Sequence, residues 1–238
     1  MVGDSLIHGP DSNVLPGMEE RGAFMPFHYA TEDAQLLLEL LEEGRYDVVV
    51  GNPPYITVKD KALNKIYRSK FVDVCKGKYA LTVPCMVQFF ALAKRGEQSG
   101  WVGMITSNSF MKREFGAPLI ESFLAQRDLR LVEDTSGAFI PGHGTPTVII
   151  VGRNQPPVET TVRAVLGVRG EPGLPDNPAR GVVWTSIVQH VDQPGWNDGW
   201  ITVADVNRTR LGAHPWSLSL DPPVNKGPFR RVYMKGAL

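Results

Sequence analysis

Cysteine is scarce in this chain of 238 residues, which has only Cys75 and Cys85. Two cysteines cannot build a disulfide framework, so free thiols in a reducing compartment are expected. The longest mostly apolar stretch, residues 79–93, is interrupted by polar residues and a proline and is too short to cross a bilayer. No basic segment precedes an apolar run as in a secretory leader. The composition therefore predicts a cytoplasmic protein without a membrane partner.

An excess of charge of either sign is also absent, because 25 basic residues balance 25 acidic ones. Domains that bind nucleic acid usually carry a basic excess. The charges are unevenly distributed, however: residues 1–47 hold ten acids and two bases, whereas residues 59–78 hold seven bases and two acids. The basic run is compatible with contacts to a phosphate backbone and equally with a solvated helix face. Metal chemistry is not indicated, since His143, in a glycine-rich turn, has no second ligand nearby.

Apolar runs and helix-period patterns alternate along the first two thirds of the chain. The expected order is helix, strand, helix, strand, helix, strand, loop and strand, at residues 31–43, 46–51, 79–94, 101–106, 114–126, 129–132, 137–144 and 147–151. This alternation predicts an α/β fold with a parallel sheet wrapped by helices. The β-branched run at 46–51 predicts a central strand covered on both faces. The last two strands lack an intervening helix, which predicts an antiparallel hairpin at the sheet edge.

The composition changes after Gly152. Residues 153–238 hold ten of the nineteen prolines and no long helical pattern, with short strands expected at 163–168 and 181–184. We expect two regions: residues 1–155, and residues 156–238 as a Pro/Gly-rich linker and the start of a β-rich region resembling a target-recognition module.

The most informative residues are Asn52-Pro53-Pro54-Tyr55, which directly follow the strand at 46–51. Both prolines have a fixed φ and no N–H to donate, and the first pushes Asn52 toward an extended backbone. Such a stiff loop holds a side-chain amide and bare carbonyls outward, beside an aromatic ring. It is an acceptor-rich pocket for a planar amine, although a proline-rich turn after a strand also explains the same residues.

This motif resembles the Asp/Asn-Pro-Pro-Tyr motif of S-adenosylmethionine-dependent amino-methyltransferases, especially the DNA adenine-N6 methyltransferases. The resemblance implies that the Asn52 side-chain oxygen and the Pro53 carbonyl bind the two N–H groups of the adenine amine. They would aim its lone pair at the methyl group, which is catalysis by positioning and electrostatics. Tyr55 would stack on a base flipped out of double-stranded DNA, with Pro54 keeping the loop rigid.

The same resemblance implies further site residues. Phe139, in the loop before the last strand, would be the second aromatic against the flipped base; a core position at a hairpin is the alternative. Lys78, Tyr79 and Asn108 fall where the family places substrate- and cofactor-facing residues. Asp4, in the element Gly3-Asp4-Ser5-Leu6, would accept a hydrogen bond from the cofactor's adenine.

Gly3-Asp4-Ser5-Leu6 also matches the motif of a hydrolase family with a nucleophilic serine. That family needs an Asp three residues before a histidine, and none of the five histidines has one. A serine without a base is a weak nucleophile. The element is equally compatible with an ordinary N-terminal turn.

The glycine-rich first strand that cradles S-adenosylmethionine in this family should precede Asp4, where only three residues stand. The sequence thus predicts a partial Rossmann-like methyltransferase fold that lacks its first strands, inactive on its own if the cofactor motif is missing. Residues 52–60, 110–116 and 134–146 resemble the PglX-like methyltransferases of bacterial phage-defence (BREX) systems, which implies phage-defence partners. Methylation of RNA or of protein glutamine, and a non-catalytic piece that binds DNA or a partner, are the alternatives.

Overall fold

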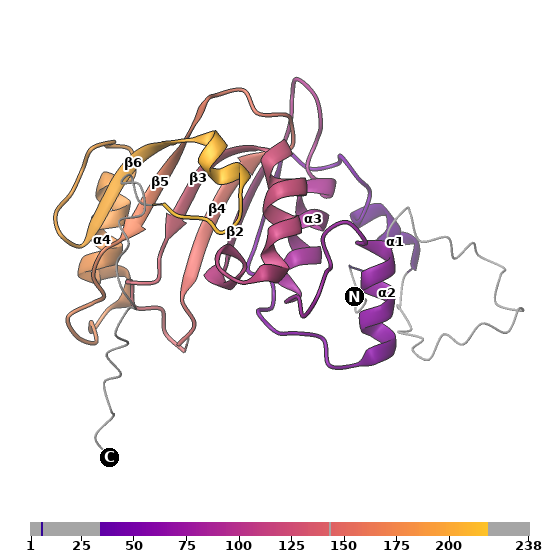
Figure 1. Cartoon of the computed structure of the whole chain (residues 1–238), viewed down its shortest axis with the longest axis horizontal. Helices are drawn as coiled ribbons and strands as arrows, with labels where there is room; N and C mark the ends of the chain where they lie inside the picture. The colour runs from indigo at the N-terminus through magenta and orange to yellow at the C-terminus, as the bar shows by residue number, and fades with distance from the viewer. Residues whose placement is uncertain (1–5, 7–33, 143, 219–238) are drawn as a thin grey trace, which may run out of the picture.

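The computed structural model describes residue 6, residues 34–142 and residues 144–218, and its centre is one six-stranded mixed sheet (Figure 1). The strands are β1 (Val48–Gly51), β2 (Trp101–Ser107), β3 (Asp128–Asp134), β4 (Thr147–Arg153), β5 (Thr161–Gly167) and β6 (Ile201–Asn207). They lie in the order β1-β2-β4-β3-β5-β6. Strands adjacent in space are thus not always adjacent in sequence.

The strand directions define two different edges of the sheet. β1 is parallel to β2, β4 is antiparallel to both β2 and β3, and β3 is parallel to β5. Strands β1, β2, β3 and β5 therefore run in the same direction and end at the same edge, called the carboxyl edge below. In α/β sheets the residues beyond the carboxyl ends of the strands usually form the functional site.

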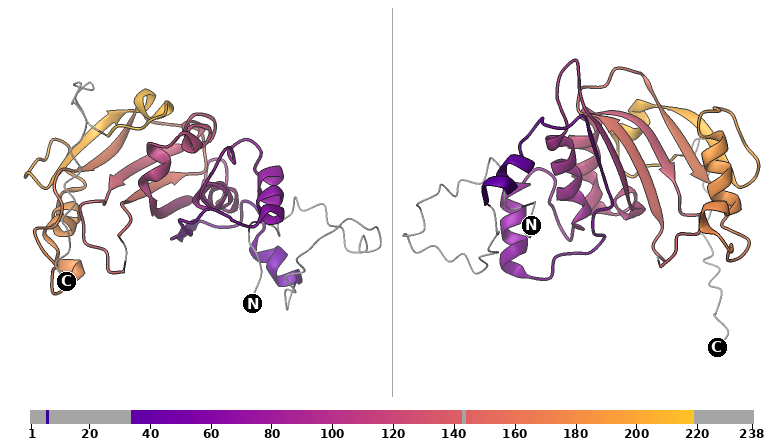
Figure 2. Two further views of the ribbon diagram at one scale, coloured as in Figure 1. Left: turned by 60° about the horizontal axis from the view of Figure 1, so that its bottom comes forward. Right: turned by 180° about the vertical axis from the view of Figure 1, so that it is seen from behind.

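Helices lie on both faces of the sheet, and the face that carries α4 is covered at β5 and β6 (Figures 1 and 2). The α-helices are α1 (Ala34–Leu40), α2 (Lys61–Lys70), α3 (Thr82–Leu92) and α4 (Val182–His190). Shorter helical segments are η1 (Asn108–Met111), η2 (Glu114–Gly116), η3 (Leu119–Phe123), η4 (Leu124–Gln126), η5 (Pro178–Arg180) and η6 (Arg208–Gly212). The larger core contains residues of α2, α3 and η1 to η4, and the smaller core contains residues of α4.

The two-residue period of the strands separates these cores. In β5, Val162 and Ala164 belong to the larger core, whereas Val165 belongs to the smaller one. In β6, Val206 belongs to the larger core and Val203 to the smaller one. Because successive strand side chains point to opposite faces, β5 and β6 are covered on both sides.

Most of the expected elements are confirmed, and the helix at 114–126 has an irregular form. Its turns are of the 3₁₀ type at both ends and of the π type at Leu119–Phe123. Leu37 and Leu41 of the first helical region are buried as its pattern predicts, while Leu36 and Leu40 on the same predicted face are exposed. Helix α2 is an additional element; Asp60 begins it by accepting a hydrogen bond from the Leu63 N–H, at 2.7 Å.

The prediction that residues 46–51 form a central strand covered on both faces is wrong for the described residues. Within them β1 is an edge strand paired only with β2, and the side chains of Val48 and Val50 are 57% and 71% exposed. Only Val49 packs against the larger core. The β-branched composition identified the strand correctly, but the neighbours that cover a strand are not encoded in its own residues.

The position of the antiparallel hairpin also differs from the prediction. β3 and β4 do pair in antiparallel fashion, but they lie inside the sheet because β5 adds to the far side of β3. The sheet is therefore continuous across the expected boundary at residue 155. The strand expected at 163–168 is confirmed as β5.

The strand expected at 181–184 is wrong, because these residues begin helix α4. The carboxylate of Glu171 accepts hydrogen bonds from the N–H groups of Val182 and Val183, at 3.0 and 2.8 Å. These donors at the start of a helix have no partner within it. A cap from a residue eleven positions away in sequence is not visible in the local pattern.

Among the described residues, no helix is long and apolar enough to cross a membrane.

Candidate active site

Three loops meet the carboxyl edge, and they carry most of the residues predicted to act. Residues 52–60 follow β1, residues 108–118 follow β2, and residues 135–146 follow β3. Asn52, Asn108 and Phe139 therefore belong to the same edge of the sheet, although 87 positions separate the first from the last. Parallel strand direction is what brings them to one side.

Loop 52–55 begins at a point of close packing between β1 and α3. Gly51 ends β1, and a Cβ added at this position would lie 2.7 Å from ring atoms of Phe89 in α3. Such a distance is shorter than real carbon contacts, so a larger residue at position 51 would force the Phe89 ring to shift. The close approach places α3 directly behind the first residue of the loop.

The side chains of Asn52 and Tyr55 are joined within the loop. The Tyr55 hydroxyl donates a hydrogen bond to Asn52 Oδ1, with an oxygen–oxygen distance of 2.6 Å. Burial raises the pKa of Tyr55 above its ordinary value of 10, against the opposing effect of its hydrogen bond to Asn52. The phenol is therefore protonated at neutral pH and acts as a donor. An amide oxygen has two lone pairs, so Asn52 Oδ1 retains one for another donor.

The backbone carbonyls of the two prolines have different surroundings. The Pro54 carbonyl accepts a hydrogen bond from the Thr82 hydroxyl at 3.3 Å, and Thr82 in turn accepts one from Thr106 at 3.0 Å. Among the described residues, none donates a hydrogen bond to the carbonyl of Pro53, which is a buried residue. An acceptor on a buried residue without a donor is one that a bound N–H group can satisfy.

The remainder of the loop is fixed to α3 and α2. The Leu81 N–H, one residue before α3, donates to the Ile56 carbonyl at 2.8 Å. Val58 and Leu63 pack against the larger core. The loop is thus held on both sides of Tyr55, while Asn52 itself is exposed.

Among the described residues, two acceptors of loop 52–55 therefore lack a full set of donors: the second lone pair of Asn52 Oδ1 and the Pro53 carbonyl. Two acceptors from adjacent residues match the two N–H bonds of a primary aromatic amine. Such a pair favours a pyramidal nitrogen, because it orients both hydrogens and leaves the lone pair directed away from them.

Asn108 lies at the start of η1, directly beyond β2. Its N–H donates to the Pro146 carbonyl at 3.0 Å, and this bond holds the end of loop 135–146 against the residues after β2. Ser107 stabilises the turn by accepting from the Ser109 N–H at 3.2 Å. Asn108 is therefore tied to the loop that carries Phe139.

Phe139 is half-buried in loop 135–146. In the strand order β1-β2-β4-β3, three interstrand spacings, roughly 14 Å, separate the ends of β1 and β3. Loop 135–146 must therefore reach across β4 and β2 for Phe139 to face Tyr55. A small cavity of about 110 Å³ lies in this loop, between Thr135, Ala138, Ile140 and Pro146 among others.

Lys78 and Tyr79 have opposite environments. Lys78 is exposed, whereas Tyr79 is 0% exposed and belongs to the larger core. The Tyr79 hydroxyl donates to the Asn64 carbonyl at 3.3 Å, and burial raises its pKa to about 12. A ring with no exposed surface cannot contact a substrate, so we do not retain Tyr79 as a substrate-facing residue.

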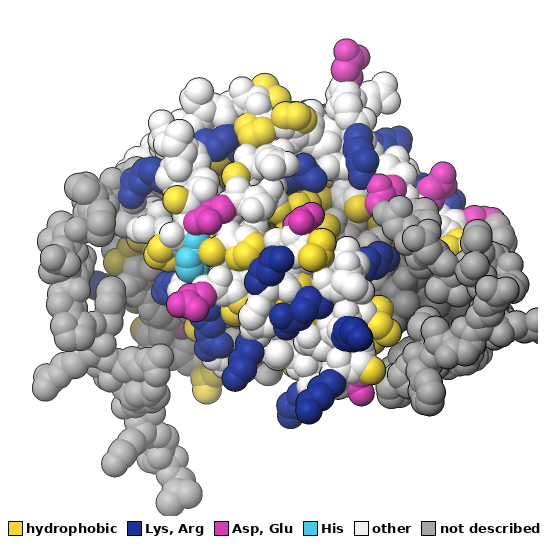
Figure 3. Space-filling view, turned by 45° about the vertical axis from the view of Figure 1, so that its right-hand side comes forward, with side chains coloured by type: hydrophobic (Ala, Val, Ile, Leu, Met, Phe, Trp, Pro, Cys, Tyr) yellow, Lys and Arg dark blue, Asp and Glu magenta, His cyan; other side chains and the backbone are white. Residues whose placement is uncertain are grey.

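Basic side chains gather on the side of the molecule that carries α2 and α3 (Figure 3). The exposed bases of the run that follows loop 52–55 are Lys59, Lys61, Lys65, Arg68, Lys76 and Lys78. Arg68 is partly committed, because it donates to the Gly77 carbonyl at 2.8 Å. The lysines keep their charges in solvent next to the carboxyl edge.

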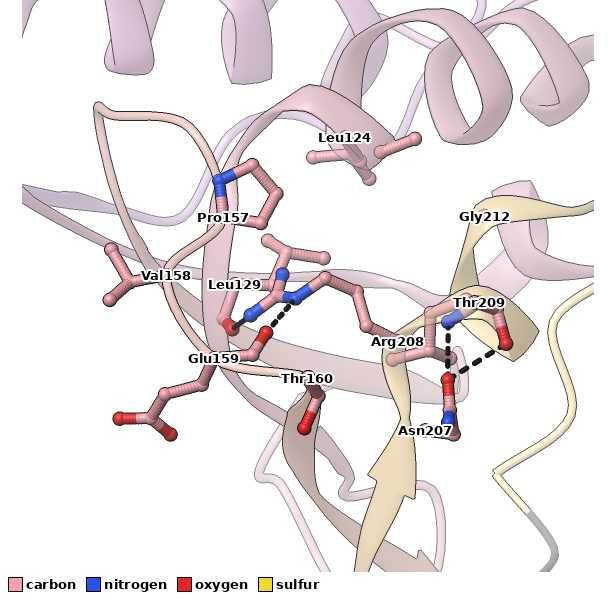
Figure 4. Close-up of a pocket in the computed structure, with 12 residues that line it drawn as sticks. Leu124, Leu129, Pro157, Val158, Glu159, Thr160, Asn207, Arg208, Thr209 and Gly212 are labelled. Atoms are coloured by element: carbon pink, nitrogen blue, oxygen red, sulfur yellow. Dashed lines mark hydrogen bonds between the residues drawn. The ribbon is translucent and has the colours of Figure 1, made fainter.

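A larger cavity, of about 510 Å³, lies at the opposite edge of the sheet (Figure 4). Arg208 forms part of its wall and donates to the carbonyls of Glu159 and Leu129, both at 2.8 Å. Arg208 also donates to the buried carboxylate of Asp128 at 3.2 Å. Because its guanidinium is already committed to these partners, it connects β6 to β3 and is not an anion site.

The sequence also led to expectations about a cofactor and about metal ions. Asp4, predicted to touch the cofactor, lies outside the described residues. Within the described chain, β1, β2, β3 and β5 are not followed by a G-x-G turn that opens a helix, the arrangement that cradles such a cofactor. No group of three metal-binding side chains occurs in this part of the chain either.

Thr82 and Thr106 contact the candidate site although sequence reasoning did not single them out. Thr82 stands 28 positions after Pro54 and begins an apolar helix, so its spacing carries no local signal. Only the packing of α3 against β1 and β2 brings its hydroxyl to the loop.

Proteins of restriction systems share this mixed α/β sheet. Two solved structures share the fold, each with a TM-score of 0.51. A protein described as a modification subunit of a type I restriction enzyme, from Vibrio vulnificus YJ016, is 16% identical; the match covers 74% of this chain and 39% of that one. The type IIG restriction endonuclease BpuSI is 14% identical, over 71% of this chain and 20% of that one.

The family model of the Eco57I restriction-modification methylases matches residues 18–139, and the chain belongs to this family. The adenine-specific methyltransferase PglX of Streptomyces coelicolor is 49% identical over 230 residues, or 92% of this chain. The match covers 19% of that relative, so the chain spans about a fifth of its length. These comparisons confirm the predicted family resemblance and the partial Rossmann-like α/β fold.

Proposed function

We propose that the chain contributes the amine-binding half of a DNA adenine-N6 methyltransferase, an enzyme that transfers a methyl group from S-adenosylmethionine to a flipped adenine in double-stranded DNA. The observation that carries this proposal is the pair of available acceptors, Asn52 Oδ1 and the Pro53 carbonyl, on a loop fixed at Gly51, Pro54 and Ile56. The 49% identity to an adenine-specific methyltransferase supports adenine as the substrate.

The chemistry follows from the properties of the amine. The lone pair of an exocyclic amine is delocalised into the purine ring, so the nitrogen is a poor nucleophile. Asn52 and Pro53 accept its two N–H bonds, reduce this delocalisation and direct the lone pair outward. Tyr55 stacks on the flipped base and Phe139 packs against its second face, which repays part of the stacking lost in the duplex.

S-adenosylmethionine, when bound, supplies an electrophilic methyl group on its sulfonium. Asp4 is the residue of this chain proposed to contact its adenine. The described residues fit the acceptor side of the reaction rather than the cofactor cradle, because they include no glycine turn of the required kind. Their part is to bind, orient and enclose the amine.

The basic side chains near loop 52–55 support nucleic acid as the substrate. Lys59 and Lys78 flank the segments that hold this loop, where the phosphates around an extruded base would lie. We also propose that Asn108 contacts the base or the backbone from the adjacent strand end. A role in phage defence, with other defence proteins as partners, is the proposed context, and residues 156–238 are proposed to lead into the region that recognises the target.

The test is substitution of Asn52 in the complete gene product. Asn52→Ala removes one acceptor and should lower the methyl-transfer rate by about 10²–10³-fold, the usual effect of losing one preorganised polar group. Asn52→Asp keeps an acceptor at the same position and should retain measurable transfer. DNA affinity should change little in either variant. Asn197→Ala, in the exposed loop before β6, is the matched control; full activity of Asn52→Ala would refute the proposal.

The same assay separates the substrates, because RNA bases and glutamine side chains also present conjugated amines. Transfer to DNA, RNA and a glutamine-bearing protein should be measured in parallel. The proposal expects DNA to be methylated and the other two not.

A second candidate function is non-catalytic binding by the isolated chain. The observation that favours it is the uncovered face of β1, where Val48 and Val50 are largely exposed. An apolar strand face of this kind normally packs against further structure. Titration calorimetry with S-adenosylmethionine distinguishes the methyltransferase function from non-catalytic binding. Absence of binding heat supports the non-catalytic function for the isolated chain.

A further inference from the structure

We propose that Thr82, supported by Thr106, is a positioning residue that holds the Pro54 carbonyl and thereby directs the Pro53 carbonyl to the amine. This inference rests on the proposed function and goes beyond the Asn-Pro-Pro-Tyr motif. It assigns a role in the reaction to two residues outside that motif, one on α3 and one on β2.

The geometry is a chain of three oxygens that leads from the sheet to the loop. Thr106 Oγ1 donates to Thr82 Oγ1 at 3.0 Å, and Thr82 Oγ1 donates to the Pro54 carbonyl at 3.3 Å. The side chains are buried, with exposed fractions of 0% for Thr106 and 2% for Thr82. The Thr106–Thr82 bond is fully buried and therefore shielded from competition with water, whereas the Thr82–Pro54 bond is part-buried because Pro54 is exposed.

The order of donors gives Thr106 a specific purpose. A hydroxyl has one hydrogen to donate and two lone pairs that accept. Because Thr106 donates to Thr82, it occupies a lone pair of Thr82 and leaves the Thr82 hydrogen directed at Pro54. Thr106 is the penultimate residue of β2. The two hydrogen bonds, called the Thr106–Thr82 relay below, therefore connect loop 52–55 to the strand next to β1.

Thr82 is not used as an ordinary helix cap. Thr82 is the first residue of α3, one position after the cap residue, whose side chain commonly satisfies the free N–H groups of a helix. The α3 N-terminus has no side-chain cap: Leu81 occupies the cap position, and the Thr82 hydroxyl is directed at Pro54. The observed bond thus serves the loop.

Holding one carbonyl determines the direction of its neighbour. Successive carbonyls of a proline-rich, extended backbone point about 120° apart in polyproline II and about 180° apart in a strand. The φ angle of Pro54 is fixed by its ring, so its ψ angle is the one torsion left between the two peptide planes, and a held Pro54 carbonyl restricts that angle. When Thr82 holds the Pro54 carbonyl against α3, the Pro53 carbonyl must point elsewhere, and no described residue donates to it.

The hydrogen bond can be observed directly in the 238-residue chain, without any assay of activity. Pro54-Tyr55 is the only Pro-Tyr step in the sequence. Proline labelled at its carbonyl carbon and tyrosine labelled at its amide nitrogen, with stable isotopes, therefore give a single carbonyl–amide cross-peak in the NMR spectrum. Thr82→Val, which removes the hydroxyl but keeps the shape, should shift this peak, and Thr82→Ser should return it.

Thr135→Val is the matched control, because Thr135 forms a buried hydroxyl pair with Thr147 at 2.7 Å elsewhere on the same sheet. It should leave the Pro54–Tyr55 peak in place. If Thr82→Val does not fold, Thr106→Val tests the same relay, since it should shift the peak in the same direction by a smaller amount. An unmoved peak in a folded Thr82→Val or Thr106→Val protein overturns the inference.

Kinetics of the complete gene product then test the consequence for the reaction. Thr82→Val should lower kcat about tenfold with little change in the KM for DNA, and Thr82→Ser should restore most of kcat. The variant with both Thr82→Val and Thr106→Val should be no slower than Thr82→Val alone, because Thr106 acts through Thr82. A shifted peak with unchanged kcat would refute the positioning role. Absence of any transfer to DNA by the unsubstituted protein would refute the proposed function instead, while the NMR result would still judge the hydrogen bond.

Discussion

The Tyr55 hydroxyl and Asn52 Oδ1 lie 2.6 Å apart in a hydrogen bond that closes loop 52–55 on itself. The bond joins the first and last of four residues, and the two between them are the prolines whose φ angles are fixed. The amide of Asn52 is thereby oriented before any ligand binds. Preorganised acceptors cost no rearrangement at the moment of reaction.

Tyr55→Phe should separate this orienting role from stacking. The ring remains and stacks on the base, but Asn52 loses its partner, so we expect kcat to fall about fivefold with an unchanged affinity for DNA. Tyr55→Ala removes the ring as well and should weaken binding of the flipped base by about 1–3 kcal/mol. Steady-state kinetics with DNA provide the measurement. Equal effects of the two substitutions would contradict the assignment.

Gly51→Ala should disturb the loop through α3. The added Cβ would meet the Phe89 ring at 2.7 Å, and overpacking of this kind costs about 1–3 kcal/mol. We expect a lower free energy of unfolding in a denaturant titration and a larger loss of methyl transfer, because the displaced residue precedes Asn52. Adding Phe89→Leu should restore both the free energy of unfolding and the rate of methyl transfer. Failure of the second substitution to help would show that the contact with Phe89 is not the cause.

Lys59→Gln combined with Lys78→Gln should reduce DNA affinity uniformly across sequences. If both side chains contact phosphates, the slope of log affinity against log salt should become less steep by about 2. Arg180→Gln, at an exposed base of η5, is the control and should leave the slope unchanged. Filter binding or anisotropy over a salt series provides the slopes. An unchanged slope would favour the alternative that these lysines belong to a solvated surface and do not contact phosphates.

Glu133 should make the stability of the protein depend on pH. It is 5% exposed, its Oε1 has no hydrogen-bond partner, and burial raises its pKa from 4.5 to about 7. As pH rises from about 4.5 to about 7, the unfolded chain loses this proton while the folded chain keeps it, so the folded state loses stability. Above pH 7 the full cost is present, up to about 3 kcal/mol.

Glu133→Gln removes this titration and serves as the comparison. The difference in unfolding free energy between the two proteins should be small near pH 4 and should grow in favour of the glutamine variant up to about pH 7. Chemical denaturation at a series of pH values measures it. A constant difference across this range would mean that Glu133 has an ordinary pKa.

Arg208→Ala should destabilise the sheet on both sides of residue 155. Asp128 is fully buried and would lose one cationic partner, and breaking such a pair costs about 3 kcal/mol or more. Because β5 pairs with β3, we expect a single cooperative unfolding transition that includes residues 161–207. Limited proteolysis and calorimetry test this. Separate transitions for the two regions would restore an independent boundary at 155.

The sequence was sufficient to predict the strands that carry the candidate site, whereas the chemistry of the site stays a prediction. The run at 46–51 and its Asn-Pro-Pro-Tyr ending are local signals, because strand composition and proline restrict the backbone residue by residue. Phe139 and Asn108 were predicted from the family resemblance, and both follow strands that end at the carboxyl edge. Tyr79 was not predicted correctly: its neighbour Lys78 is exposed, and burial of the ring depends on how α2 packs.

The sequence did not predict relations between distant residues. The cap from Glu171 that makes residues 182–190 helical, the insertion of β4 between β2 and β3, and the Thr106–Thr82 relay each depend on contacts between segments remote in the chain. Local periodicity contains no information about which strand pairs with which. For the same reason the exposure of Val48 and Val50 was not foreseen.

The segment after β6 returns across the molecule and is anchored beside η1. The Trp216 N–H donates to the Met111 carbonyl at 2.9 Å, and its ring meets Phe110 edge to face. Met111 is three residues beyond Asn108. The chain that follows β6 is therefore fixed at the carboxyl end of β2, next to the segment that carries Asn108.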